Sequence, residues 1–178
     1  RGLMLVLHRA GHIELPRQRS CPANPFVERR KPAPLPLLTW VPLEATVAEI
    51  RPLEIHQVRR TGEEGLFNSF LEAYHYLGYT QPVGEHLKYL ISARGTPVAC
   101  MAWSSAPRHI GCRDRYIGWS QEVRRRNINL LAYNTRYLIL PWVKVPYLAS
   151  HVLSEVARRI SRDWETLYRH PINFLETI

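Results

Sequence analysis

The chain has 178 residues, of which 46% are hydrophobic and 22% charged, as is typical of a globular domain that buries its own core. These proportions exclude a fully disordered or fibrous chain, and no run of about eighteen apolar residues occurs that could span a membrane. Lysine and arginine together number 24 against 15 acidic residues, and only Lys31, Lys88 and Lys144 are lysines. This excess of arginine indicates a polyanionic partner, nucleic acid first.

The cysteines and the two ends of the chain bear on its setting. Cys21, Cys100 and Cys112 form no Cys-x-x-Cys pair, so we expect neither a zinc site built on such pairs nor a disulfide framework. A reducing, cytoplasmic location is expected, because the first residues also lack the features of a signal peptide. The chain starts at Arg1 and ends at Ile178 within a strand-like run, which predicts a piece of a longer protein.

The N-terminal part divides into two segments. Residues 1–20 are predicted to be the end of a winged-helix-like segment, in which a helix is closed by Gly11 and followed by a short strand over 12–16. Residues 21–45 are predicted to be a proline-rich, extended linker. The basic run at 29–31 within it fits either a strap on a phosphate backbone or a plain linker.

Residues 46–178 are predicted to form one globular α/β (α+β) domain with a mixed sheet and flanking helices. Its expected elements, in chain order, are a short helix and strand over 47–57, a helix over 63–77 ended by Gly78, a hairpin over 86–103, an irregular stretch over 104–119, a helix over 121–134 capped by Ser120, a strand over 136–140, a helix from 148 and a last strand over 172–178. The strand from 98 to 103 is almost wholly apolar, so we expect it to be buried on both faces.

The order of hairpin, strand, loop and helix resembles the GNAT fold of acetyl-CoA-dependent acyltransferases, in which this loop binds a pyrophosphate. The resemblance implies a loop of the type Arg/Gln-x-x-Gly-x-Gly/Ala. In this chain Val145 and Tyr147 stand where the glycines should be, and Pro146 has no amide to donate. We therefore expect that the fold is kept, that CoA binding is lost and that no cofactor is held.

Several strings of the sequence together resemble the family of the Druantia anti-phage system protein DruA. These strings are Gly118–Ser120, Asn134-x-Arg136, Leu138–Val143, Leu148–Leu153, Phe174–Thr177, His75–Gly78, Trp103–Ala106 and Gly11-x-Ile13-x-Leu15-Pro16. The resemblance implies DNA as the substrate and anti-phage defence or mobile elements as the context. It also implies a transposase domain or other defence-system subunits as partners.

Three residues are candidates for catalysis. Tyr76 could attack a phosphodiester with His75 as its base, or both could be aromatic residues that pack at a helix end. Ser104 ends a buried strand and could bind or attack phosphate, or it could satisfy backbone groups where the strand stops. We expect a site in a crevice where the strands over 98–103 and 136–140 end.

Basic and amide side chains are candidates for nucleic-acid binding, since arginine contacts phosphates and stacks on bases. Asn134 and Asn127 are expected seven residues apart on one helical face, with Asn134 and Arg136 as the preferred site pair. The predicted nucleic-acid-binding residues are Arg113, Arg115, Arg124, Arg125, Arg126, Asn134, Arg136 and Lys144. No His, Cys, Asp and Glu pattern predicts a metal site.

The function that the sequence favours is DNA binding in anti-phage defence or in a mobile element, with DNA strand cleavage or transfer as the candidate reaction. Two alternatives stay open. One is an active acyltransferase with an atypical cofactor loop. The other is a non-catalytic DNA-binding module of a larger transposase or defence complex.

Overall fold

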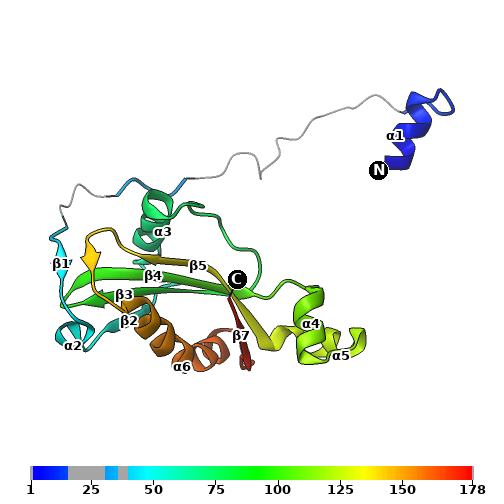
Figure 1. Ribbon diagram of the computed structural model, residues 1–178. Helices are drawn as coiled ribbons and strands as arrows, with labels where there is room; N and C mark the ends of the chain where they lie inside the picture. The colour runs from blue at the N-terminus through cyan, green and yellow to red at the C-terminus, as the bar shows by residue number, and fades with distance from the viewer. Residues whose placement is uncertain (1, 16–30, 36–39, 178) are drawn as a thin grey trace. The chain divides into compact units, whose positions relative to one another are not determined.

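The computed structural model describes residues 2–15, 31–35 and 40–177 (Figure 1). The chain forms two compact units, Arg1–Arg30 and Lys31–Ile178. Within the described part, no helix is long and apolar enough to cross a membrane.

The first unit contains the helix α1 (Gly2–Arg9). Gly11 closes it with a φ of 77°, and the N–H groups of Gly11 and His12 donate to the carbonyls of His8 and Leu7 at 3.0 and 2.9 Å. This is a Schellman motif, which confirms Gly11 as the C-terminal cap. The strand expected over 12–16 is wrong for residues 12–15, which are irregular and pair with no described strand. Residue 16 and most of the proline-rich linker, including Arg29 and Arg30, lie outside the described residues.

The second unit is built on a five-stranded mixed sheet with the order β2-β3-β4-β5-β7. All neighbours are antiparallel except β5 and β7, which are parallel. The strands are β2 (Glu54–Gln57), β3 (His86–Ala93), β4 (Thr96–Ser105), β5 (Leu131–Ile139) and β7 (Phe174–Glu176). The hairpin of β3 and β4 is confirmed, and Arg94 and Gly95 form its turn with φ values of 51° and 74°.

One long helix covers each face of this sheet (Figure 1). The helix α3 (Glu64–Tyr74) lies on one face, and α6 (Leu148–Tyr168) lies on the other. The buried residues of α6 recur every four positions, as expected for one apolar stripe: Leu148, Val152, Val156, Ile160 and Trp164. The predicted mixed α/β class with flanking helices is confirmed.

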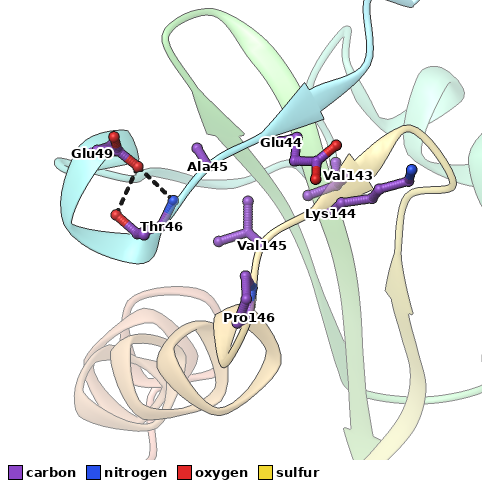
Figure 2. A pocket seen from close by; sticks show the side chains of 8 residues that line it. All are labelled: Glu44, Ala45, Thr46, Glu49, Val143, Lys144, Val145 and Pro146. Carbon is purple, nitrogen blue, oxygen red and sulfur yellow. Dashed lines mark hydrogen bonds between the residues drawn. The ribbon is translucent and has the colours of Figure 1, made fainter.

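A second, two-stranded sheet joins the start of the unit to the loop before α6. The strand β1 (Leu43–Glu44) pairs in parallel with β6 (Val143–Lys144). The short helix α2 (Val47–Ile50) follows, and Figure 2 shows how the Glu49 carboxylate at its start accepts from the N–H and hydroxyl of Thr46 at 2.7 and 2.8 Å. Beside β1, Trp40 stacks on Trp142 with ring centroids 5.0 Å apart.

The stretch between β4 and β5 corrects two sequence-based expectations. Residues 104–119 are not wholly irregular, because they include the end of β4 and the helix α4 (Gly111–Ile117). The helix capped by Ser120 is α5 (Gln121–Asn127), which ends seven residues early in the 3-10 turn η1 (Ile128–Leu130). Residues from 131 onward pair with β4 and β7 instead, and this pairing overrides local helix propensity. Asn127 and Asn134 therefore do not share a helical face.

The helix α3 also ends earlier than expected. Gly78 has the positive φ of 60° that its prediction as a terminator requires, but His75 has already left the helix with an extended backbone. His75 and Tyr76 consequently lie in the turn that follows α3, and not on the helix.

The cap of α5 gives a first prediction. The Ser120 hydroxyl accepts from the N–H of Val123 at 3.3 Å. We expect Ser120→Ala to lower the free energy of unfolding by about 1 kcal/mol, the usual cost of losing such a cap. Ser120→Asp should keep the stability, because its carboxylate can accept the same bond. Urea denaturation of the three proteins would show this, and equal stability of the alanine variant would contradict it.

Candidate functional site

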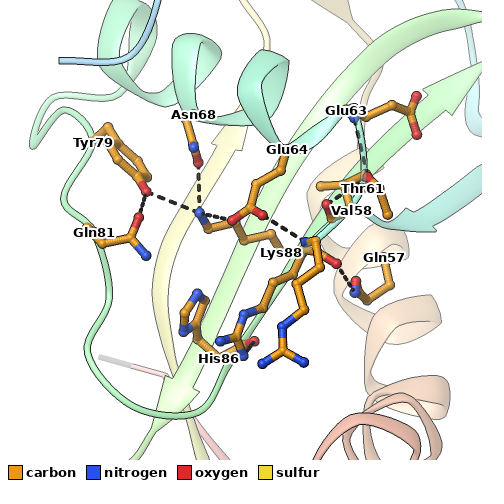
Figure 3. A network of polar contacts seen from close by, with 12 residues as sticks. Gln57, Val58, Thr61, Glu63, Glu64, Asn68, Tyr79, Gln81, His86 and Lys88 are labelled. Atoms are coloured by element: carbon orange, nitrogen blue, oxygen red, sulfur yellow. Dashed lines mark hydrogen bonds and ion pairs between the residues drawn. The ribbon is translucent and has the colours of Figure 1, made fainter. Parts of the chain in front are cut away.

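A buried lysine lies at the centre of the sheet face that α3 covers. The side chain of Lys88 is 1% exposed, and its Nζ donates to Glu64 Oε1 at 2.7 Å, Asn68 Oδ1 at 2.8 Å and Tyr79 Oη at 3.2 Å. Figure 3 shows these groups converging on Nζ from α3 and from the loop before β3. Three acceptors use all three N–H groups of the ammonium. Lys88 therefore ties α3 and this loop to the sheet.

The surroundings of Lys88 shift the pKa values of this cluster. Burial lowers the pKa of Lys88, and its hydrogen bond to Glu64 opposes this shift. Burial alone would raise the pKa of Glu64, but the hydrogen bonds from Lys88 and from the Arg60 backbone outweigh it and hold this pKa below its ordinary value. Burial, with the nearby Glu64 charge, raises the pKa of Tyr79 to about 12. Around neutral pH the cluster thus holds an ion pair and a neutral phenol.

Beside this cluster is a cavity of about 160 Å³, which we call the α3 pocket. Four apolar residues line it: Phe67, Leu71, Pro82 and Ala102. Six polar residues complete it: Tyr79, Thr80, Lys88, Ser104, Thr135 and Arg136. Its inner residues include Lys88, Ala102 and Ser104, all buried, whereas Thr80 is exposed. The pocket therefore opens on the side of the loop that contains Thr80.

The floor of the pocket is one row across three strands. Ala102 is directly opposite Lys88 on one side and Arg136 on the other. Because Ala102 has only a methyl group, a space remains between the two cationic side chains. The expected crevice where both strands end does not form. Because β4 and β5 are antiparallel, their C-terminal ends point in opposite directions. Ser104 and Arg136 nevertheless line the same pocket.

A β-bulge places Arg136 in this row. Ala102 pairs with Arg136 and Trp103 pairs with Asn134, so Thr135 is an extra residue in β5. The side chains of Asn134 and Thr135 both donate to the Ala102 carbonyl, at 3.1 and 3.3 Å. Asn134 therefore holds the backbone of the bulge. Bulges of this kind redirect side chains beside functional sites.

Arg136 is the basic residue of the pocket without a described carboxylate partner. Its Nε donates to the Gly78 carbonyl at 3.1 Å and its Nη1 to the Thr135 carbonyl at 2.6 Å. Its Nη2 donates to no described residue. A half-buried guanidinium with free donors is suited to an anion such as phosphate.

His75 and Tyr76 lie in the turn that ends at Gly78, whose carbonyl accepts from Arg136, but they are not arranged as base and nucleophile. Their rings are stacked with centroids 4.7 Å apart, and His75 Nδ1 accepts from the N–H of Leu77 at 3.1 Å. In the neutral imidazole the proton is then on Nε2, which can only donate. Burial, together with the Arg136 charge, lowers the pKa of His75. Tyr76 is 88% exposed.

The segment between β4 and β5, residues 106–130, forms a helical projection at one end of the sheet, which we call the arginine lobe (Figure 1). Two of its predicted nucleic-acid-binding residues hold it together. Arg113, which is buried, donates to Asp114 at 3.0 Å and to Glu176 at 3.2 Å. Arg124 donates to the other oxygen of Asp114 at 2.8 Å. These bonds, that of Arg124 first, hold the pKa of Asp114 below its ordinary value.

The remaining arginines of the arginine lobe face solvent. Arg108, Arg115, Arg125 and Arg126 are exposed, and of these only Arg126 has a described ion-pair partner, Glu122. Tyr116 beside Arg115 is 94% exposed. Lys144 is exposed too, but it lies in β6 opposite Glu44 and away from the lobe.

The loop before α6 has a structure of its own in place of a pyrophosphate loop. Val143 and Lys144 are paired with β1, and an open cavity of about 650 Å³ is lined by two acids, Glu44 and Glu49, against one cation, Lys144 (Figure 2). Tyr147 has a φ of 63°, a conformation that glycine would adopt without strain. The acids and the side chains of the loop both disfavour a bound pyrophosphate.

Of the residues that line the α3 pocket, the sequence predicted Ser104 and Arg136 and missed the others. Lys88 was not among the predicted site residues. The sequence feature that could have indicated a buried polar partner is on α3. There Glu64 and Asn68, four residues apart, interrupt an otherwise apolar face. His86 was missed as well. It is buried, its Nδ1 donates to the Gly84 carbonyl at 2.8 Å, and its Nε2 has no described partner.

Comparison with known proteins identifies one family. Residues 37–177, well over half of the chain, match the family described as Druantia protein DruA. Neither the curated proteins nor the solved structures include a match to the chain.

The Lys88 cluster gives a second prediction. Lys88→Met should lower the free energy of unfolding by about 3 kcal/mol, because it leaves the Glu64 carboxylate without its cation. The double variant Lys88→Met/Glu64→Gln should lose less than the single variant, because no unpaired charge remains. Chemical denaturation at neutral pH measures both. Equal losses in the two variants would show that the ion pair is not what stabilises α3 on the sheet.

The loop before α6 gives a third prediction. Acetyl-CoA should produce no binding heat in calorimetry at micromolar concentrations, because Val145 and Tyr147 present side chains where backbone amides would have to approach a pyrophosphate and Pro146 has no N–H. A complex of low-micromolar affinity would contradict this and would support the acyltransferase alternative.

Proposed function

The chain belongs to the family of Druantia protein DruA, and on that premise we propose that it is a DNA-binding protein of anti-phage defence. The surface that binds the phosphate backbone is the arginine lobe. Other defence-system subunits or a transposase domain are the partners we expect.

The charge of the arginine lobe is the observation that carries this proposal. The lobe has two acids, Asp114 and Glu122, against six arginines: Arg108, Arg113, Arg115, Arg124, Arg125 and Arg126. The charge of Asp114 is neutralised by ion pairs with Arg113 and Arg124 inside the lobe. The outward-facing charge is therefore almost entirely positive, which favours a polyanion.

Tyr116 supports contact with bases as well as phosphates. Its ring is almost fully exposed on the same helix as Arg115, whereas tyrosine is usually intermediate in burial. An aromatic ring beside a guanidinium is a stacking platform for unpaired bases.

Strand cleavage or transfer stays a prediction from the sequence. Tyr76 is accessible, but His75 is not placed to take its proton. Ser104 is buried at the inner end of the α3 pocket, where a phosphodiester in the backbone of DNA has little access. The geometry thus supports binding more directly than catalysis, which also fits a non-catalytic module of a larger defence or transposase complex.

A salt titration tests the role of the arginine lobe. Each phosphate contact contributes about 0.7 to 0.9 to the slope of log K against log salt. We expect Arg115→Gln/Arg125→Gln/Arg126→Gln to reduce the magnitude of that slope by about 2 and to weaken binding in low salt. Fluorescence anisotropy with a labelled oligonucleotide at several salt concentrations gives both values.

A matched control separates the lobe from net charge. Arg158, Arg162 and Arg169 are also exposed, but they lie on or just after α6. Replacing these three by glutamine removes the same charge and should leave the slope unchanged. If both triple variants lose affinity equally, binding follows overall charge and the lobe is not the interface.

A further inference from the structure

The α3 pocket is too small for a whole cofactor. Its volume of about 160 Å³ is below the roughly 300 Å³ at which sites for complete small molecules begin. It is open at the side of Thr80 and closed at Ala102. A space of this size and shape accepts one projecting group of a larger molecule that stays outside.

The lining of the pocket indicates what that group is. Phe67, Leu71 and Pro82 give apolar walls, and the ring of Tyr79 adds an aromatic surface. Hydroxyl groups of Ser104, Thr80 and Thr135 provide hydrogen-bonding partners. Apolar and aromatic walls with a few polar groups suit a neutral, flat ring with donors and acceptors along its edge.

The two cations of the pocket differ in what they can bind. Lys88 is neutralised by Glu64, and its three N–H groups already have acceptors. Lys88 therefore lines the pocket without offering a free N–H group or an unpaired charge to a ligand. Arg136 has free donors on Nη2, has no described carboxylate partner and is half-buried. The group outside the pocket should accordingly carry a negative charge close to the ring.

A neutral flat ring joined to an anion and carried on a polymer is a nucleotide within a nucleic acid. We infer that the α3 pocket binds a single unpaired base of DNA, with Arg136 on the phosphate of the same nucleotide. This inference rests on the proposed DNA-binding function and names a second contact in it. The arginine lobe holds the backbone, and the pocket holds one base that has left its stack, as proteins that act on or select single bases do.

Photocrosslinking tests this inference directly. Single-stranded DNA that contains 4-thiothymidine is bound to the full chain and irradiated, and the adducts are located by peptide mass spectrometry. We expect adducts on Phe67 or Tyr79 in addition to those on the arginine lobe. Ala102→Leu fills the floor of the pocket and should remove the former adducts while leaving the latter.

A second variant keeps the test valid if Ala102→Leu does not fold. Thr80 is exposed at the opening, so Thr80→Trp should block the pocket from outside without disturbing the core. Ala102→Ser, which keeps the pocket open, is the matched control. Blocking should weaken binding of single-stranded DNA about tenfold, within the range that stacking of one base contributes. The magnitude of the slope of log K against log salt should fall by no more than about 0.7, the share of the one phosphate that Arg136 contacts.

The outcomes distinguish this inference from the proposed function. If the arginine-lobe variants lose DNA binding as expected but adducts never form at Phe67 or Tyr79, or persist in both blocked variants, only the base pocket is wrong. If the unaltered chain binds no DNA, the proposed function and the base pocket are both wrong.

Discussion

The buried ammonium of Lys88 is the constraint on which the rest of the α3 side of the sheet depends. An unpaired charge there would cost several kcal/mol, so the chain must bring acceptors to it from outside β3. It does so with Glu64 and Asn68 of α3 and with Tyr79 of the following loop. The position of α3 and the path of the loop are thus fixed together. The α3 pocket is the space left between them and the small side chain of Ala102.

In the arginine lobe the buried central charge is negative, the carboxylate of Asp114, and its partners are cations. None of the residues of α5 is buried, and the buried residues of α4 are Arg113 and Asp114. The two helices of the lobe therefore bury no apolar side chain, and the carboxylate of Asp114 accepts hydrogen bonds from the guanidinium groups of Arg113 and Arg124. A segment held by ion pairs needs few apolar residues, which leaves its surface free for further arginines. Structural and exposed arginines alternate along one short segment for this reason.

The sequence predicted best those features that a single element decides. The apolar stripe of α6, the hairpin of β3 and β4, the Ser120 cap and the Gly11 closure each depend on residues close together in the chain. The predictions failed where residues far apart in the chain determine the secondary structure or the contact. The segment from Leu131 onward is a strand because β4 and β7 lie on either side of it. Likewise, nothing near Arg113 in sequence shows that Glu176 will contact it. Ser104 and Arg136 line one pocket because Arg136 pairs with Ala102, and Ser104 follows two residues later on the same face of β4.

The bulge at Thr135 is what makes Arg136 available to the α3 pocket. Side chains alternate between the faces of a sheet, so a shift of one residue moves a side chain to the other face. Without the extra residue, Thr135 would pair with Ala102, and Arg136 would lie opposite Met101 on the face that α6 covers. The bonds from Asn134 and Thr135 to the Ala102 carbonyl hold the extra residue in place. Asn134 therefore acts on the pocket by positioning Arg136, which gives a physical reason why an asparagine and an arginine stand two residues apart in the middle of this strand.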